Sequence, residues 1–213
     1  MKKENIEALF QGLSKSIPNP KSDLRFENNF QLLIAVMLSA QTTDVSVNVA
    51  TPDLFQIAPT PEKMVELGID GIRERIKKIG LYNMKAANVL KTCTLLIEKH
   101  QSKVPATREE LEALPGVGRK TAGVVLNVAF QQNTIPVDTH VFRIANRTGL
   151  VKTKTPTDTE LKLLKIVPKW ALPKAHHLLI LHGRYTCKAK KMLCPSCVIE
   201  PQCEFKEKIK VTE

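Results

Sequence analysis

The sequence predicts an all-α protein. Apolar residues recur with helical spacing along almost the whole chain, the period-two alternation expected of strands is essentially missing, and helix-start signatures stand between the apolar stripes. With 213 residues, the chain is long enough to bury a sizeable core as one large domain or two small ones. We therefore expect a helical globular protein.

The first expected helices are one amphipathic and one buried segment. The apolar stripe nearest the N-terminus stops at Pro18-Asn19-Pro20, because proline does not continue a helix. That stripe consists of Ile6, Leu9, Phe10, Leu13 and Ile17. Residues 30–38 are apolar apart from Gln31, which is typical of a central buried helix.

Later helices are marked by caps and stripes. Thr60, followed by proline, fits an N-cap. Thr107 with Glu110 and Thr157 with Glu160 resemble capping boxes and predict two further helix starts. The stripes between them are Ile72, Ile76 and Ile79 on a short helix ending at Gly80, and then Ala86, Val89, Leu90, Cys93, Leu96 and Ile97.

Two polar interruptions suggest domain boundaries. One is the segment 131–133 and the other is the proline-containing segment 18–22. Together they isolate a central block, and both chain ends are left to form a second unit. Periodicity alone does not prove that the two ends pair.

The charge of the chain points to a polyanionic partner. Its 32 Lys and Arg against 21 Asp and Glu give a net charge of +11 and a pI of about 9.5, and such charge displaces counterions from phosphate. No segment approaches the ~20 apolar residues of a membrane span. Residues 1–12 lack a continuous apolar core, so we expect no signal peptide, a cytoplasmic location and reduced thiols.

The segment 114–122, with sequence LPGVGRKTA, is the most informative in the chain. Gly116 and Gly118 allow backbone to approach a bulky group, while Arg119 and Lys120 fall in the first turn of the next helix. A helix start offers unpaired N–H donors and a positive dipole end, which suits phosphate. Eighteen residues after Lys120, Asp138 stands at the expected start of another helix. An amine and a carboxylate near a phosphate-binding turn suggest chemistry on a nucleic-acid backbone.

Four cysteines near the C-terminus have the spacing of a metal centre. Cys187, Cys194, Cys197 and Cys203 follow the pattern C-x6-C-x2-C-x5-C. Structural zinc sites typically contain two pairs of closely spaced ligands, and only one C-x2-C pair is present here. The spacing therefore favours a [4Fe–4S] cluster, and zinc is the alternative. The loop between the ligands carries Lys188, Lys190 and Lys191, and we expect it to present positive charge to DNA.

These features together resemble the endonuclease III family, bifunctional DNA glycosylases and abasic-site lyases of the helix-hairpin-helix superfamily. The resemblance runs nearly end to end. It is carried by the segments 38–44, 80–83, 114–122, 137–140 and 181–187 and by the cysteine spacing.

The resemblance implies a fold and a division into domains. Residues 22–132 would form a six-helix barrel-like domain with the helix-hairpin-helix, and residues 1–21 and 133–213 a [4Fe–4S] cluster domain. It implies a monomeric, nucleoid-associated base-excision repair enzyme that acts on double-stranded DNA containing an oxidised pyrimidine or an abasic site.

The resemblance also implies roles for single residues. Lys120 would attack the sugar and form a Schiff base, and Asp138 would accept or relay the proton. Gln41 would fill the gap beside the orphaned base, and Leu81 would wedge into the opposite strand. The DNA contacts would then include Gly116, Gly118, Arg119, Lys190 and Lys191.

Two alternatives are distinguished by particular residues. A mismatch adenine glycosylase shares the hairpin, the aspartate and the cluster, but this chain has Lys120 and Ala35 where that class typically carries a small hydroxyl residue and a glutamate. A non-catalytic helix-hairpin-helix DNA-binding module would keep the hairpin and cluster as structure and make no use of Lys120 and Asp138.

Overall fold

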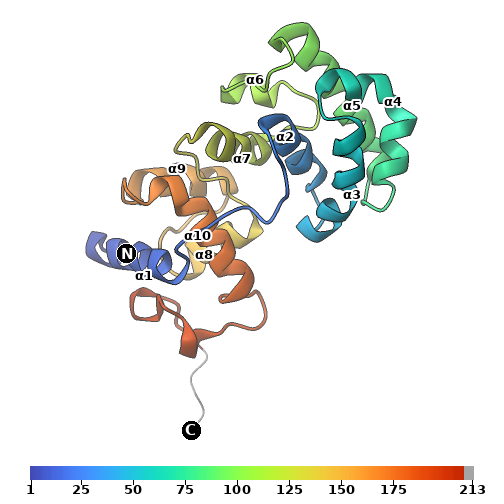
Figure 1. The fold of residues 1–213 in the computed structure, drawn as a ribbon. Coiled ribbons are helices and arrows are strands. Elements are labelled where there is room, and N and C mark those ends of the chain that lie inside the picture. The colour runs from blue at the N-terminus through green and yellow to red at the C-terminus, as the bar shows by residue number, and fades with distance from the viewer. Residues whose placement is uncertain (209–213) are drawn as a thin grey trace. The chain divides into compact units, whose positions relative to one another are not determined.

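The computed structural model describes residues 1–208, and within them every regular element is helical (Figure 1). One isolated antiparallel bridge joins Cys187 and Met192. The all-α prediction is thus confirmed. The α-helices are α1 Lys3–Ser16, α2 Asn29–Leu38, α3 Asp44–Ile57, α4 Pro61–Ile76, α5 Tyr82–His100, α6 Arg108–Glu112, α7 Arg119–Phe130, α8 Thr139–Arg147, α9 Pro156–Ile166 and α10 Leu172–Tyr185, and two short 3-10 helices are η1 Cys194–Ser196 and η2 Glu200–Gln202.

The contacts of the chain divide it into two compact units, each with its own apolar core. We call Ser22–Phe130 the central unit, which contains α2 to α7. Met1–Lys21 and the chain from Gln131 onward make up the terminal unit. Both ends of the described chain therefore belong to one core.

The central unit is built around α2. Every residue of this helix after its first is buried, as its uniformly apolar sequence predicts. Asn28 caps it by accepting a hydrogen bond from the Gln31 amide. Helices α3, α5 and α7 all contact α2, and α5 also lies along α4. The helix of the glycine turn, α7, is thus held directly by the most buried helix of the unit.

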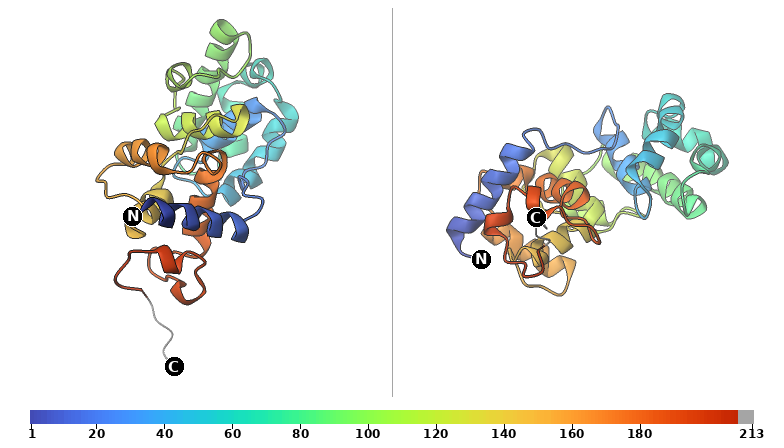
Figure 2. Two further views of the ribbon diagram at one scale, coloured as in Figure 1. Left: turned by 90° about the vertical axis from the view of Figure 1, so that its left-hand side faces the viewer. Right: turned by 90° about the horizontal axis from the view of Figure 1, so that it is seen from below.

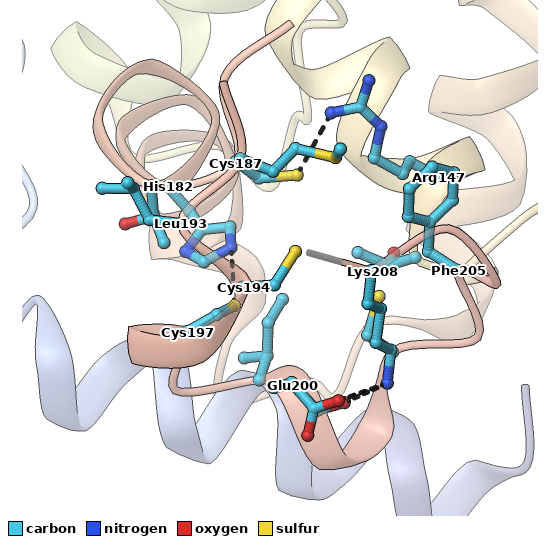
Figure 3. A pocket seen from close by; sticks show the side chains of 14 residues that line it. Arg147, His182, Cys187, Leu193, Cys194, Cys197, Glu200, Phe205 and Lys208 are labelled. Atoms are coloured by element: carbon cyan, nitrogen blue, oxygen red, sulfur yellow. Dashed lines mark hydrogen bonds and ion pairs between the residues drawn. The ribbon is translucent and has the colours of Figure 1, made fainter. Parts of the chain in front are cut away.

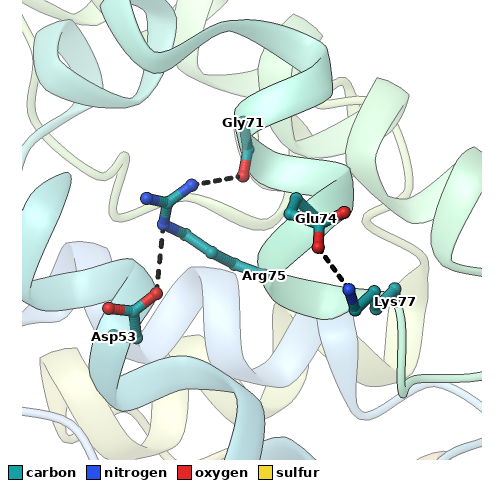
Figure 4. Close-up of polar contacts among 5 residues, drawn as sticks. All are labelled: Asp53, Gly71, Glu74, Arg75 and Lys77. Atoms are coloured by element: carbon teal, nitrogen blue, oxygen red, sulfur yellow. Dashed lines mark hydrogen bonds and ion pairs between the residues drawn. The ribbon is translucent and has the colours of Figure 1, made fainter.

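Helices α3 and α4 are joined by an ion pair as well as by apolar packing (Figure 4). The Arg75 guanidinium lies 3.2 Å from the Asp53 carboxylate and donates to the Gly71 carbonyl at 2.9 Å. The backbone of α4 breaks at Gly68, where φ is +71°. The helix predicted to end at Gly80 ends four residues earlier, at Ile76.

The N-caps test the helix starts read from the sequence. Thr60 and Thr107 accept hydrogen bonds from amides three residues on, so both predicted starts are confirmed. The predicted capping box at Thr157 is wrong, because α9 is capped by Thr155, which accepts from the Asp158 amide at 3.1 Å. Pro156 explains the difference: the residue before a proline avoids helical backbone angles, so Thr155 lies outside the helix.

In the terminal unit the two ends of the chain pack together. Helix α1 contacts α10 and η2, as the two views of Figure 2 show with the blue and red segments side by side. Helix α8 packs against α10, and its residues Val141, Ile144 and Ala145 are buried there. This core carries both the Asp138 turn and the cysteine-rich segment. Among the helices of residues 1–208, none has the length and apolar composition needed to cross a membrane.

Candidate functional site

The glycine turn is held in place by α5. Gly116 has a φ of +79°, a conformation that side chains disfavour, and a Cβ added there would lie 2.8 Å from Asn88 Nδ2. The Thr92 hydroxyl donates to the Pro115 carbonyl at 3.0 Å. Glycine is therefore required at 116 both by the backbone angle and by the closeness of α5.

Gly118 differs from Gly116 in its surroundings. It is exposed, and nothing lies within 4 Å of where its Cβ would be. The Gly118 carbonyl accepts from the Ala122 amide at 2.9 Å, at the start of α7. The backbone at this helix start is open to solvent, and its predicted contact with phosphate stays a prediction.

Lys120 lies in the first turn of α7 and its side chain is exposed. Its neighbour Arg119 is half-buried, and the Arg119 carbonyl accepts from Arg108 Nη1 at 3.3 Å. Two of the predicted basic residues thus stand together behind the glycine turn, with the primary amine free to reach a ligand.

Gln41 and Leu81 are exposed side chains on two turns of the central unit, with Leu81 53% exposed. Both have left-handed backbone angles, with φ of +54° and +60°. Each such non-glycine residue costs on the order of 1 kcal/mol and persists only where the surrounding structure enforces it. Gln101, Ser102 and Gln131 also have positive φ, so the backbone angle alone does not distinguish Gln41 and Leu81.

Lys85 was not among the predicted site residues. It is only 5% exposed, and its ammonium donates to the Leu38 carbonyl at 2.9 Å and to Thr42 Oγ1 at 2.6 Å. Burial lowers the pKa of Lys85 from its usual value. The sequence offered one indication that Lys85 is buried: it lies four residues before Val89, on the buried face of α5.

Asp138 is the N-cap of α8. Its Oδ1 accepts from the Val141 amide at 2.8 Å, and its side chain is half-buried. The segment before it is held by His176, a buried side chain whose Nδ1 lies 2.8 Å from the Pro136 carbonyl. The structure thus confirms the predicted cap. Asp138 belongs to the terminal unit, whereas Lys120 belongs to the central one.

All four predicted metal ligands line a single cavity in the terminal unit (Figure 3). Burial raises the pKa of Cys197 and of Cys203 in the absence of a metal. Metal binding would release those protons, since the thiolate is the ligand. Within residues 1–208, no three His, Cys, Asp or Glu side chains are grouped to hold one metal ion.

Two arginines of α8 contact the segment that carries the cysteines. Arg147 Nη1 lies 3.5 Å from Cys187 Sγ and donates to the Lys188 carbonyl at 2.9 Å, and its guanidinium stacks on Phe205 (Figure 3). Arg143 Nη2 donates to the Gly183 carbonyl at 2.8 Å and to the Cys187 carbonyl at 3.2 Å. These two arginines therefore fix the segment that enters the cavity.

A buried histidine completes the lining. His182 Nε2 lies 3.6 Å from Cys197 Sγ, and burial lowers the pKa of this imidazole to about 4, so the ring is neutral at pH 7. Neither the arginines nor His182 had a predicted role, because their partners lie 15 to 44 residues away in the sequence. Lys190 and Lys191 are exposed on the loop between Cys187 and Cys194.

Known proteins resemble this chain over nearly its whole length. The profile of the HhH-GPD superfamily of base excision DNA repair proteins matches residues 34–169. Endonuclease III of Escherichia coli strain K12 is 54% identical over 210 residues, covering 99% of each chain, and that of Haemophilus influenzae is 54% identical over 208 residues, covering 98% of each.

Two solved structures have the same fold as this chain over nearly its whole length. A trapped endonuclease III–DNA covalent intermediate matches with a TM-score of 0.90 at 42% identity, covering 96% of each chain. A thermostable thymine-DNA glycosylase shares the fold, with a TM-score of 0.85 at 22% identity over 95% of this chain and 96% of that one.

Proposed function

Because the chain belongs to the HhH-GPD superfamily of base excision DNA repair proteins, and within it to the endonuclease III family, we propose that its DNA glycosylase and abasic-site lyase activities act on oxidised pyrimidines. The observation that carries the proposal is Lys120, an exposed primary amine in the first turn of α7, directly behind an open glycine turn. We further propose that the enzyme works as a monomer on the chromosome.

Lys120 is the nucleophile. Its neutral amine attacks C1′ of the damaged nucleotide, a C–N bond forms, and the bond to the base breaks. Opening of the sugar ring then gives a Schiff base. Loss of a C2′ proton from this imine breaks the C3′–O bond and expels the 3′ phosphate, so the strand is cut by β-elimination.

Asp138 accepts the proton that Lys120 loses and stabilises the positive charge that develops on the sugar. The support for this role is its capped geometry, because the Val141 amide fixes the position of one carboxylate oxygen. An acid held in this way needs little reorganisation during the reaction.

The remaining predicted residues of the central unit would bind and open the duplex. The backbone at Gly116 and Gly118 and the Arg119 side chain hold the phosphates, which positions the DNA without reading its sequence. The damaged base must leave the stack at a cost of a few kcal/mol. Gln41 then fills the gap and Leu81 enters the opposite strand; the exposure of both side chains supports these roles.

We assign a [4Fe–4S] cluster to Cys187, Cys194, Cys197 and Cys203. An all-sulfur donor set lining one cavity fits this group, and Arg147 and Lys208 at its edge offset the negative charge of a cluster bound by four thiolates. When bound, the cluster ties the ends of the basic loop together. Lys190 and Lys191 on that loop then contact DNA phosphates.

Borohydride trapping tests the proposal. Incubating the protein with a duplex that contains thymine glycol, in the presence of borohydride, should give a covalent protein–DNA adduct through reduction of the Schiff base. The adduct should disappear in Lys120→Ala and persist in Lys91→Ala, which alters an exposed lysine on α5. Binding without adduct or strand cleavage by the unaltered protein would instead identify a non-catalytic DNA-binding module.

A further inference from the structure

Two turns of the central unit that contain a left-handed non-glycine residue, those of Gln41 and Leu81, share one buried cation. Gln41 lies in the turn between α2 and α3, and Leu81 is the N-cap of α5. Between them in space is Lys85, whose ammonium contacts the turn of Gln41 while its backbone belongs to the first turn of α5.

Lys85 contacts the turn of Leu81 through its backbone amide and the turn of Gln41 through its ammonium group. The Lys85 amide donates to the Leu81 carbonyl at 3.0 Å, which is the first backbone bond of α5 and ties the lysine to the Leu81 turn through the helix itself. Its ammonium donates to the Leu38 carbonyl at 2.9 Å and to Thr42 Oγ1 at 2.6 Å, on either side of Gln41. These partners lie 47 and 43 residues from Lys85 in the sequence, so the bonds are a tertiary connection between two separate turns.

A buried ammonium is costly unless it is fully paired, and this one has a suitable partner. Leu38 is the last residue of α2, so its carbonyl stands at the negative end of that helix. The Lys85 ammonium thereby donates a hydrogen bond to a carbonyl at the C-terminus of α2, which an apolar side chain could not do. A leucine or methionine would pack equally well on α5 but would leave the carbonyl without this donor.

We propose that Lys85 is a positioning residue that locks the turns of Gln41 and Leu81 to one another, so that both side chains enter the duplex together. The inference rests on the proposed roles of Gln41 and Leu81 in base extrusion. Lys85 itself touches neither the sugar nor the base; it acts by holding strained backbone in the conformation that extrusion requires.

This role predicts a defect limited to substrates from which a base must be extruded. The Lys85→Met variant keeps the apolar stem and removes the ammonium. On a duplex with thymine glycol, its kcat/KM should fall at least tenfold. On a single-stranded oligonucleotide that already contains an abasic site, which has no base to extrude and no opposite strand, the lyase rate should stay within about twofold of the unaltered enzyme.

Three further proteins make the test specific. Lys91→Met removes an exposed lysine from the same helix and should leave both rates unchanged. The double variant Lys85→Met with Gln41→Ala should be little worse than Gln41→Ala alone, because both changes disable the same turn. If Lys85→Met does not fold, Thr42→Val removes one acceptor of the ammonium from a half-buried turn and should show the same selective loss to a smaller degree.

The outcomes separate this inference from the proposed function. Equal losses on the two substrates, full activity of Lys85→Met on the duplex, or additive effects in the double variant would each overturn the positioning role. Failure of the unaltered protein to cleave either substrate would instead overturn the proposed function.

Discussion

At the scale of single residues, one side chain often serves the fold and the chemistry together. Asp138 caps α8 through one carboxylate oxygen, and its proposed task is to accept a proton. Gly116 satisfies a left-handed backbone angle and leaves room for Asn88, and its proposed task is to let phosphate approach. Substitutions that keep one role and remove the other can separate the two.

Asp138→Asn is such a substitution. Asparagine caps helices about as well as aspartate, so the free energy of unfolding should change by only a few tenths of a kcal/mol. Asparagine cannot accept the proton, and the single-turnover glycosylase rate should fall on the order of 100-fold or more. Thermal unfolding and single-turnover assays measure the two effects. A variant with more than half the normal rate would leave Asp138 as a cap only.

The two glycines of the turn should respond differently to alanine. Gly116→Ala introduces a Cβ 2.8 Å from Asn88 Nδ2 at a φ of +79°, and should lower the free energy of unfolding by at least about 1–2 kcal/mol. Gly118→Ala meets nothing within 4 Å and should melt normally, yet bind DNA more weakly, because its methyl group would face the phosphate. Denaturant unfolding and DNA titrations compare the pair, and equal effects of both would contradict the phosphate role.

At the scale of elements, α5 organises the central unit. Its first turn carries Leu81, its buried face carries Lys85, and Asn88 and Thr92 support the glycine turn. The corresponding element of the terminal unit is α8, with Asp138 at its start and Arg143 and Arg147 against the cysteine segment.

These roles explain what the sequence could and could not predict. Caps and apolar stripes depend on residues three or four positions apart, so α1, α2 and the starts at Thr60 and Thr107 were readable locally. Helix α3 was not predicted, because its exposed residues Val45 and Val49 are apolar and hide the contrast between its buried and exposed faces. The cavity lining and Lys85 depend on partners far away in the chain, and no local pattern reports them.

The loop between Cys187 and Cys194 should contribute to DNA affinity through charge. Arg147 fixes its backbone by donating to the carbonyls of Lys188 and Ala189, while Lys190 and Lys191 stay exposed. If each lysine neutralises one phosphate, Lys190→Ala and Lys191→Ala should each reduce the slope of log K against log salt by about 0.9. Titrations at several salt concentrations measure the slope. Lys99→Ala, at the exposed end of α5, is the control.

At the scale of the whole molecule, the important feature is two apolar cores in one chain. The core of the central unit draws on no residue of the terminal unit. The cysteine cavity belongs to the terminal unit alone. The two units can therefore differ in their free energies of unfolding, and loss of the metal centre should destabilise mainly the terminal unit.

Removing a cluster ligand tests this independence. In Cys203→Ser, iron content should fall, and amide hydrogen exchange should accelerate in α1, α8 and α10 while α2 and α7 stay protected. Cys93→Ala is the matched control, since Cys93 is buried in the central core and should leave the iron content unchanged. Equal acceleration throughout both units would show that the cores do not act separately.

The pairing of α1 with α10 has a consequence for biosynthesis. Helix α1 is translated long before the residues of α10 that pack against it. At ~5–20 residues per second, the ribosome needs on the order of ten seconds to make them. During this delay the central unit has all the residues of its core, whereas α1 still lacks its contacts with α10. We therefore expect the terminal unit to complete its core after the central unit has folded.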